Sequence, residues 1–535
     1  MNNMRKYKSF YVAISLIIGL SVVSCIEETI PTDVATQDQI ESSSKAIESM
    51  LWSMPAYVNK YDLMDEDLAY DWGYGSLMHI RDVMTEEMVV VSSNYDWYDS
   101  WESNQYMGAD WMSTGFVWRY YFRFIQTSNK MLSAIDESTA SETELEYQGV
   151  ALAFRALAYL DIAQMYEFLP NDTTSSINDD GNNVLNLTVP IVKETMVESD
   201  VRNNPRATRD SMFAFILSDL DKAEDRLIDA KRLSKTLPDI SVVYGLKARL
   251  YMWVANYSKA EEYARKAIDL NEYTPTTKEE WLSTTTGFNN IDCSSWMWGA
   301  QTKKEDEVVQ SGILNWTSWM SNEAQYGYAA AGPMTCVASG FYAKIDNQDF
   351  RKLSWKAPEG SILFGKESYI DEKFGSKMVD YASIKFRPGN GNIEDYQIGS
   401  ACSYPMMRIE EMYFIEAEAA AHQNAERGKQ LLTDFMTKYR YKTYKCDFSS
   451  TEDIVNEIFL QKRIELWGEG LSFFDYKRLN KPVVRKYDGT NFSDATQFTT
   501  TTRPAWMNFV ISRREVSNNT ALKGWNNPDP SNKYE

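Results

Sequence analysis

The segment SVVYGLKARLYMWVANYSKAEEYARKAIDL, residues 241–270, decides the fold of this chain. Small and aromatic residues recur along it at helical spacing: Ala248, Tyr251, Tyr257, Ala260, Ala264 and Ala267. Small residues at this spacing let two antiparallel helices approach each other closely. The segment therefore predicts a pair of packed helices, and it sets the expectation for the chain on both sides of it.

This pair of helices is similar to one tetratricopeptide repeat. Further helices are predicted before and after it. Their ranges are 37–52, 116–135, 144–168, a helix that opens at Thr208, 405–423, 428–441 and 451–480. Pro55 is expected to end or kink the first helix, and Pro170 to stop the third. Apolar residues cover nearly all sides of the third helix, which predicts that it is buried between others. We therefore expect a mostly α-helical fold on a tetratricopeptide-repeat-like scaffold.

The composition changes between about Thr274 and Ser403. Gly, Ser, Asn and Trp become more frequent there, and the helical periodicity fades. The stretch CSSWMWGAQ, residues 293–301, predicts a short strand, in which Trp296 and Trp298 are expected to lie in the core on at least one face. The remainder is predicted to form long irregular loops, which in compact proteins are usually functional.

The composition argues against several classes of function. The 535 residues carry a formal charge of −21, whereas nucleic-acid binding requires a basic surface. The same charge opposes adhesion to anionic lipid by charge alone. The chain has only two histidines, His79 and His422, far apart in the sequence, which argues against a zinc site or a Ser/His/Asp triad. Its five cysteines include no CxxC pair. We expect no metal site and no cofactor.

The first 25 residues have the pattern of an export signal. Arg5, Lys6 and Lys8 precede an apolar run from residue 10 to about residue 23, which is too short to span a bilayer. The run ends in VVSC, which resembles a bacterial lipobox, so Cys25 is the expected lipidation site. Several acyl chains give stable anchoring where one does not. We expect an exported, lipid-tethered protein, with residues 25–36 as its tether.

A second unusual stretch is SSNYDWYDSWESNQYMGADW, residues 92–111. It carries six Trp and Tyr rings among polar residues, with almost no Leu, Ile or Val to bury them. An indole or phenol ring can cover the C–H face of a pyranose while Asn, Asp and Arg bond the hydroxyl groups. Both kinds of group occur at Asn94, Tyr95, Asp96, Trp97, Tyr98 and Trp101. The stretch therefore predicts a sugar-binding loop.

Several segments in order resemble the SusD/RagB family of outer-membrane glycan-binding lipoproteins. FRALAYLDIAQMYEFLP is similar to a buried helix of that family that runs into a proline, and PRATRDSMFAFILSDLDKAEDRL to its Pro-Arg-x-Thr helix start. MMRIEEMYFIEAEA is similar to its Arg-x-x-Glu…Ala-Glu-Ala helix. LQKRIELWGEGLSFFDYKRLN is similar to its Arg-x-x-Glu-Leu…Glu-Gly…Asp-x-x-Arg segment. The resemblance spans nearly all of the chain after the lipobox.

This resemblance implies a non-catalytic protein of the outer membrane that captures glycans and passes them to a SusC-like TonB-dependent transporter. Acidic residues directly after Cys25 further imply display on the outer face of the cell. The implied organisation is a signal peptide at 1–24, a tether at 25–36 and one SusD-like domain at 37–535. Within that domain we expect an N-terminal helical part at 37–273, a loop-rich region at 274–403 and a C-terminal helical part at 404–535.

The resemblance also implies which residues contact the glycan. In that family the site is built largely from an aromatic-bearing loop just before the helix that corresponds to 116–135, which is where Asn94–Trp101 lie. Loops of the irregular middle region can fold over the N-terminal helices, so Trp319 or Tyr326 is expected to complete the site. Arg81 and Asp67 are expected to contribute hydrogen bonds.

Two alternative functions remain open from the sequence. One is the capture of peptides or glycoproteins on the same scaffold, for which a groove with edge strands or paired carboxylates would be expected. The other is glycoside hydrolysis, which needs two acids about 5–9.5 Å apart across a cleft. The acids and arginines with helical spacing, Arg463, Glu465, Glu469, Asp475 and Arg478, are expected to form a structural ion-pair network. Glu410, Glu411, Glu416 and Glu418 are expected to form a solvated or capped helix face.

Overall fold

The computed structural model of the chain describes residues 44–534. The described residues from Glu48 onward belong to one compact unit. The predicted signal peptide, the lipidation site Cys25, the tether at 25–36 and the start of the first predicted helix lie outside the described residues.

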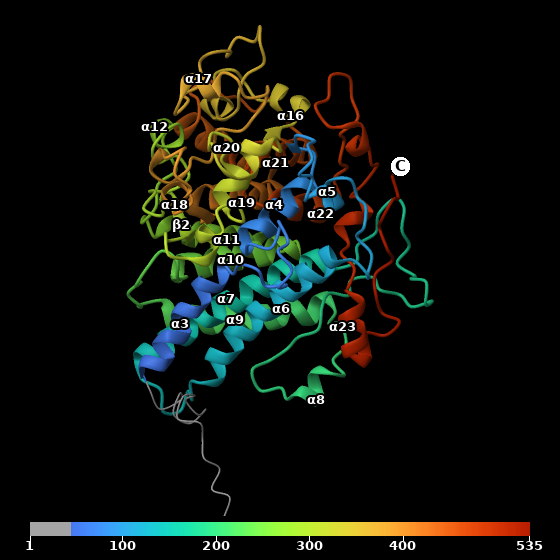
Figure 1. Cartoon of the computed structure of the whole chain (residues 1–535). Helices are drawn as coiled ribbons and strands as arrows, with labels where there is room; N and C mark the ends of the chain where they lie inside the picture. The colour runs from blue at the N-terminus through green and yellow to red at the C-terminus, as the bar shows by residue number, and fades with distance from the viewer. Residues whose placement is uncertain (1–43, 535) are drawn as a thin grey trace, which may run out of the picture. The chain divides into compact units, whose positions relative to one another are not determined.

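Long helices packed in antiparallel pairs form the scaffold of this unit (Figure 1). They are α3 (Ser44–Val58), α6 (Met112–Ser133), α7 (Glu142–Tyr166), α9 (Arg209–Leu227), α10 (Ile240–Trp253), α11 (Tyr257–Asp269), α19 (Ile409–Gln423), α20 (Ala425–Tyr439) and α21 (Thr451–Glu465). α7 packs against α6 and α9, and α19 packs against α11, α20 and α21. The expected mostly helical scaffold is confirmed.

The pair α10 and α11 shows why the segment 241–270 folds as predicted. Asp239 and Asn256 cap the two helices by accepting hydrogen bonds from the backbone N–H groups of Val242 and Lys259. The alanines of α11 are buried against neighbouring helices, which small side chains allow. The Tyr251 ring stacks on the ring of Tyr263 with 5.6 Å between the centroids. The capping residues and the close packing of small side chains therefore both favour the predicted pair of helices.

The core helix α7 is buried along nearly its whole length, as predicted. Ser141 and Glu144 form a reciprocal capping box at its start, and the helix ends at Tyr166, before Pro170. None of the helices that the structure describes combines the length and the apolar content needed to cross a lipid bilayer.

Short elements fill the remainder of the chain. The helices are α4 (Tyr74–Val83), α5 (Asp99–Glu102), α8 (Glu198–Val201), α12 (Lys278–Trp281), α13 (Glu307–Gln310), α14 (Trp316–Met320), α15 (Gly327–Ala331), α16 (Ser339–Ala343), α17 (Glu372–Gly375), α18 (Tyr396–Gly399), α22 (Ser472–Arg478) and α23 (Arg513–Asn518). Strand β1 (Met88–Val90) pairs antiparallel with β3 (Thr335–Val337). Strand β2 (Trp296–Gln301), in the stretch predicted as a strand, pairs antiparallel with β4 (Ser403–Arg408), and both Trp296 and Trp298 are buried.

Several predicted helix boundaries are wrong. The predicted helix 405–423 begins at Ile409, because residues 405–408 lie in β4, and the predicted helix 116–135 begins at Met112. α3 continues past Pro55 to Val58, and α20 begins at Ala425 instead of residue 428. The predicted helix 451–480 is divided into α21 and α22, because Gly468 and Gly470 between them have φ of 78° and 70°. A Cβ atom at Gly470 would lie 2.6 Å from Cα of Met78, so the turn also brings two backbones into close contact.

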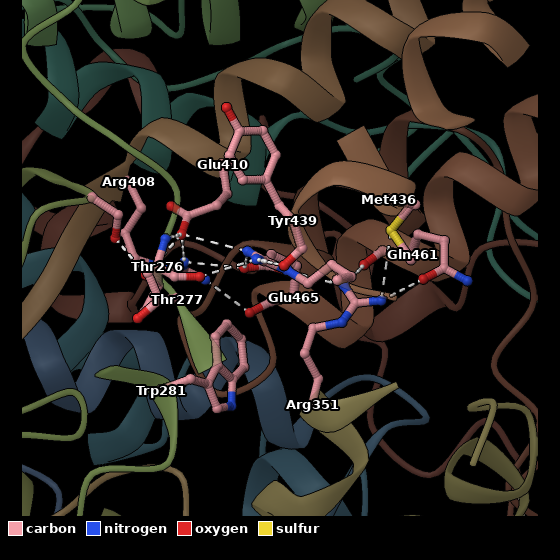
Figure 2. Close-up of polar contacts among 12 residues, drawn as sticks. Thr276, Thr277, Trp281, Arg351, Arg408, Glu410, Met436, Tyr439, Gln461 and Glu465 are labelled. Atoms are coloured by element: carbon pink, nitrogen blue, oxygen red, sulfur yellow. Dashed lines mark hydrogen bonds and ion pairs between the residues drawn. The ribbon is translucent and has the colours of Figure 1, made fainter. Parts of the chain in front are cut away.

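A buried network of charges joins the C-terminal helices to the middle of the chain (Figure 2). The carboxylate of Glu465 accepts hydrogen bonds from Arg440 at 2.6 and 2.7 Å, from Arg351 at 2.9 Å and from Arg408 at 3.2 Å. Burial alone would raise the pKa of Glu465, but the guanidinium groups of Arg440, Arg351 and Arg408 hold it well below its ordinary value. The predicted structural role of Glu465 is confirmed. The other four residues of the predicted network are also ion-paired, in the pairs Arg463–Glu86, Glu469–Lys385 and Asp475–Arg478.

The four acids of α19 do not form a solvated face, and this prediction is wrong. All four are buried, with exposed fractions of 3% or less, and each is ion-paired with an arginine. The pairs are Glu410–Arg408, Glu411–Arg249, Glu416–Arg265 and Glu418–Arg478. Three of these arginines come from other helices, so the partners could not be recognised from the spacing within α19.

Candidate functional site

Residues 92–98, called the Trp97 loop below, present two rings to solvent. The indole of Trp97 is 47% exposed and the phenol of Tyr95 is 42% exposed, beside exposed Asn94 and Asp96. The backbone N–H of Ser93 donates to Asp96 Oδ1 at 2.7 Å, and that of Trp97 donates to the Tyr95 carbonyl at 2.9 Å. These local hydrogen bonds order the backbone of the loop, and the ring of Tyr95 also packs against Tyr328.

The two other predicted rings of this stretch are buried beneath the loop. Tyr98 accepts a hydrogen bond from Trp72 Nε1 at 2.9 Å and shares another with Ser76 Oγ at 2.9 Å. Trp101 packs edge-on against Tyr70, with 5.0 Å between the ring centroids. Their position corrects the expectation that Tyr98 and Trp101 contact the glycan directly, since a buried ring has no face to offer a ligand.

Trp319 lies in the same aromatic cluster, as the folding-over of the middle region predicted, but it too is buried. It contacts Tyr98 edge-on at 4.8 Å and stacks on Tyr328 at 4.2 Å. Tyr328 in turn contacts the exposed ring of Tyr95 at 6.0 Å. Trp319 therefore supports the Trp97 loop from below instead of forming part of its surface.

The space enclosed under the loop is small. Tyr95, Asp96, Trp97 and Trp319 border a recess of about 20 Å³ with Ser493 and Thr496 of the C-terminal region. A volume of this size holds about one water molecule. A sugar would therefore lie across the exposed rings and not inside the recess.

The three remaining predicted residues lie outside this recess. Arg81 is fully buried and joins α4 to α7 and to the 470 turn, because it donates to Asp161 at 2.9 Å and to the Gly470 carbonyl at 2.8 Å. Its predicted contact with a glycan is therefore corrected to a structural role. Asp67 is exposed in the loop before α4, and the half-buried Tyr326 donates to the Asn392 carbonyl at 3.3 Å.

Glu102, which also borders the recess, has an unusual protonation equilibrium. Burial raises its pKa from 4.5 to about 7, and the positive charge of Arg485 opposes this only in part. One of its carboxylate oxygens accepts a hydrogen bond from the backbone N–H of Val90 at 3.3 Å. The base of the Trp97 loop is thus sensitive to pH near neutrality.

A larger hollow of the described unit lies elsewhere and was missed from the sequence. It is a groove of about 1130 Å³ between α6, the segment 190–204 and the region of α23. The exposed ring of Trp111 borders it beside a row of cationic residues on α6. The signal in the sequence was the four-three-four spacing of Arg119, Arg123, Gln126 and Lys130, which places them on one helix face.

Between residues 44 and 534, no three His, Cys, Asp or Glu side chains converge in a way that would hold a metal ion. The scaffold and the ordered loop together define a class of protein: helical-repeat binding proteins that present aromatic rings on a loop held by a buried cluster.

Sequence comparison identifies the family within that class. Residues 38–252 match the family described as "Starch-binding associating with outer membrane", and residues 247–532 match the family described as "SusD family". The second match alone covers more than half of the chain. The chain therefore belongs to the SusD family, as the resemblance implied.

Solved structures share the fold across almost the whole chain. A SusD-like carbohydrate binding protein from Bacteroides vulgatus has a TM-score of 0.69 at 22% identity, covering 90% of this chain and 97% of its own. A SusD superfamily protein from Bacteroides thetaiotaomicron has a TM-score of 0.66 at 18% identity, covering 91% and 99%. Surface glycan-binding protein A from Bacteroides thetaiotaomicron, in complex with laminarihexaose, has a TM-score of 0.62 at 14% identity, covering 90% and 99%. No curated protein matches the chain by sequence.

Proposed function

We propose that this protein binds an oligosaccharide or polysaccharide at the cell surface and that Trp97 and Tyr95 make the stacking contacts. The single observation that carries the proposal is the pair of exposed rings on an ordered polar loop. Each ring offers a face to the C–H groups of a pyranose, and Asn94 and Asp96 lie beside them to bond its hydroxyl groups. Membership of the SusD family supports the same ligand class.

Delivery to a transporter and attachment to the membrane form the second part of the proposal. The protein hands its ligand to a SusC-like TonB-dependent transporter in the outer membrane, and acyl chains on Cys25 hold it there, facing the cell exterior. The lipobox-like end of the export signal and the outer-membrane association of the matched family support this part. A Cys25→Ser variant expressed in its native host should leave the membrane fraction, and retention in that fraction would contradict the anchor.

A peptide ligand is less well supported by the architecture. Peptide capture by strand addition requires an exposed strand edge. The strands between residues 44 and 534 are buried except for Gln301 at the end of β2. Two of the carboxylates that line the large groove, Asp110 and Glu194, are already ion-paired with arginines. Exposed rings, and not edge strands or paired carboxylates, are thus the feature available to a ligand.

A glycosidase would need a carboxylic acid with a raised pKa beside a second acid across the sugar. Burial raises the pKa of Glu102 to about 7 and that of Asp71 to about 6, but both side chains are buried and accept hydrogen bonds from the backbone, Glu102 from Val90 and Asp71 from Met64. We therefore propose a non-catalytic protein.

The function is tested by electrophoresis of the purified protein through gels that contain single polysaccharides, with chromatography of the incubated polysaccharides in parallel. We expect slowed migration in at least one gel and no released sugars. Unchanged migration across a broad panel would contradict glycan binding, and released oligosaccharides would contradict the non-catalytic assignment.

A further inference from the structure

The groove between α6, the segment 190–204 and α23, called the basic groove below, has a charge opposite to that of the chain. Seven cationic side chains line it against three carboxylates, although the formal net charge of the chain is −21. The cations are Arg119, Arg123, Lys130, Lys193, Arg202, Arg513 and Arg514. A concave surface with cations concentrated on its walls focuses a positive potential into its interior.

Most of the negative charge in the basic groove is already neutralised. Asp110 is bonded to Arg513 at 2.6 Å, and Glu194 is bonded to the buried Arg155 at 2.5 Å. Glu515 is the third carboxylate. Asp110 therefore cancels one cation of the groove, Arg513, and Arg202 is paired with Glu198. The five remaining cations outnumber the remaining acid, Glu515, so the groove stays positive.

Several of the cations have no partner within the described part of the chain. Arg119, Arg123, Lys130 and Arg514 form no ion pair and no side-chain hydrogen bond with any residue between 44 and 534, whereas the buried arginines of the core are paired. Arg123 and Lys130 are exposed on the same face of α6. These side chains are available to an anionic ligand without breaking an existing contact.

The basic groove also contains aromatic surface. Trp111, at the start of α6, is 47% exposed and is held by the ring of Tyr106 at 4.4 Å between centroids. Further along the groove, the half-buried Phe122 stacks on Trp118 at 4.4 Å. Rings beside unpaired cations suit a ligand that has both C–H faces and negative groups.

We propose that the basic groove binds an anionic glycan, in which carboxylate or sulfate groups pair with Arg123, Lys130 and Arg514 while a sugar ring stacks on Trp111. The inference rests on the proposed glycan-binding function and assigns it a ligand class at a second site, away from the Trp97 loop. A polymer chain fits a concave groove, whereas a flat membrane surface contacts a convex or planar face. The shape therefore favours a soluble polyanion over a lipid headgroup layer.

The test uses calorimetric titration of the full protein with oligogalacturonate and with a sulfated chondroitin oligosaccharide. Methyl-esterified oligogalacturonate is the neutral reference for the carboxylates. Desulfated chondroitin, which keeps its uronate carboxylates, is the reference for the sulfate groups alone. Arg123→Glu combined with Lys130→Glu reverses two exposed charges of the groove. Lys373→Glu combined with Lys377→Glu, in and next to α17, reverses two exposed charges outside it.

We expect at least one anionic chain to bind and its methyl-esterified or desulfated reference form to bind more weakly. The groove variant should lower the affinity about tenfold or more, because two attractions become repulsions, and the α17 variant should leave it unchanged. Binding should also weaken between about 0.1 M and about 1 M sodium chloride, over which the screening length falls from about 10 Å to about 3 Å. Trp111→Ala should weaken the same binding, which a purely ionic contact would not require.

Three results would overturn the inference. Absence of anionic binding while a neutral glycan binds through Trp97 would remove the basic groove as a glycan site and leave the proposed function standing. Absence of all glycan binding would overturn both. Binding of anionic phospholipid vesicles that requires Arg123 and Lys130, without binding of either oligosaccharide, would replace the glycan by a membrane.

Discussion

Trp97 and Tyr98 are neighbours in the chain with opposite environments: the indole of Trp97 is 47% exposed, whereas the phenol of Tyr98 is 2% exposed and bonded to Trp72 and Ser76. The buried ring anchors the segment and the exposed ring is presented to solvent. This division explains why a polar stretch carries so many large rings. Part of them builds a support, and the rest forms the surface that the support holds in place.

Tyr98→Phe should destabilise the protein by about 1–3 kcal/mol, because the buried Nε1–H of Trp72 loses its acceptor. Tyr95→Phe removes a hydroxyl from an exposed ring and should change the free energy of unfolding by less than about 0.5 kcal/mol. Urea denaturation of both variants measures the difference. Equal stabilities would contradict the anchoring role of Tyr98.

Trp101→Phe tests whether the buried rings act only as a support. We expect a loss of about 1–3 kcal/mol in the free energy of unfolding, since the smaller ring leaves unfilled space against Tyr70. The affinity of this variant for a glycan should stay within about twofold of the natural protein's affinity. That difference in binding free energy is smaller than the value of about 1.4 kcal/mol for a tenfold change. A large loss of glycan affinity in a variant that remains folded would indicate that Trp101 contacts the glycan directly.

Glu102→Gln tests the pH sensitivity at the base of the loop. Burial raises the pKa of Glu102 from 4.5 to about 7 in the folded protein, so folding binds a proton between these values. The contribution of Glu102 to stability is therefore complete below pH 4.5 and is lost as the pH rises through 7. The Gln variant lacks this loss, so its stability relative to the natural protein should rise across that range by up to about 3 kcal/mol. A stability difference that is constant with pH would contradict the buried, protonated state.

Glu465→Gln should cost about 3–5 kcal/mol in the free energy of unfolding, because three buried guanidinium groups lose a shared charge. Glu198→Gln, which breaks an ion pair with Arg202 on the surface, should cost less than about 1 kcal/mol. Since the pKa of Glu465 is depressed in the folded state, the advantage of the natural protein should persist down to pH 4.5 and decline only in stronger acid. Similar costs for the two variants, measured by thermal denaturation, would contradict the structural importance of the network.

The helical scaffold could be predicted from the sequence because its signals are local. The small residues of α11, the capping residues and the apolar periodicity of α7 each act within one or two helical turns. The predicted helix boundaries are wrong where tertiary packing overrides a local sequence rule. The helix that contains Pro55 continues for three more residues, and two glycines with positive φ separate α21 from α22.

The candidate site could be predicted only in part. The polar aromatic stretch identified the Trp97 loop, but consecutive rings in an irregular segment give no periodicity from which to tell the exposed from the buried. The basic groove joins α6 to residues near Arg514, almost 400 positions later in the chain. Such a pairing depends on tertiary contacts, as do the arginine partners of the α19 acids, and no local pattern specifies it.

The central claim is tested most directly by the affinity of a Trp97→Ala variant for a glycan that the natural protein binds, measured by calorimetric titration. Trp525→Ala is the matched control, because Trp525 is 39% exposed and lies outside both the Trp97 recess and the basic groove. We predict that Trp97→Ala weakens glycan binding about tenfold or more, because one stacked ring is lost. The thermal stability of this variant should equal that of the natural protein, and Trp525→Ala should bind the glycan with unchanged affinity. Equal affinities for the natural protein and the Trp97→Ala variant would contradict the account.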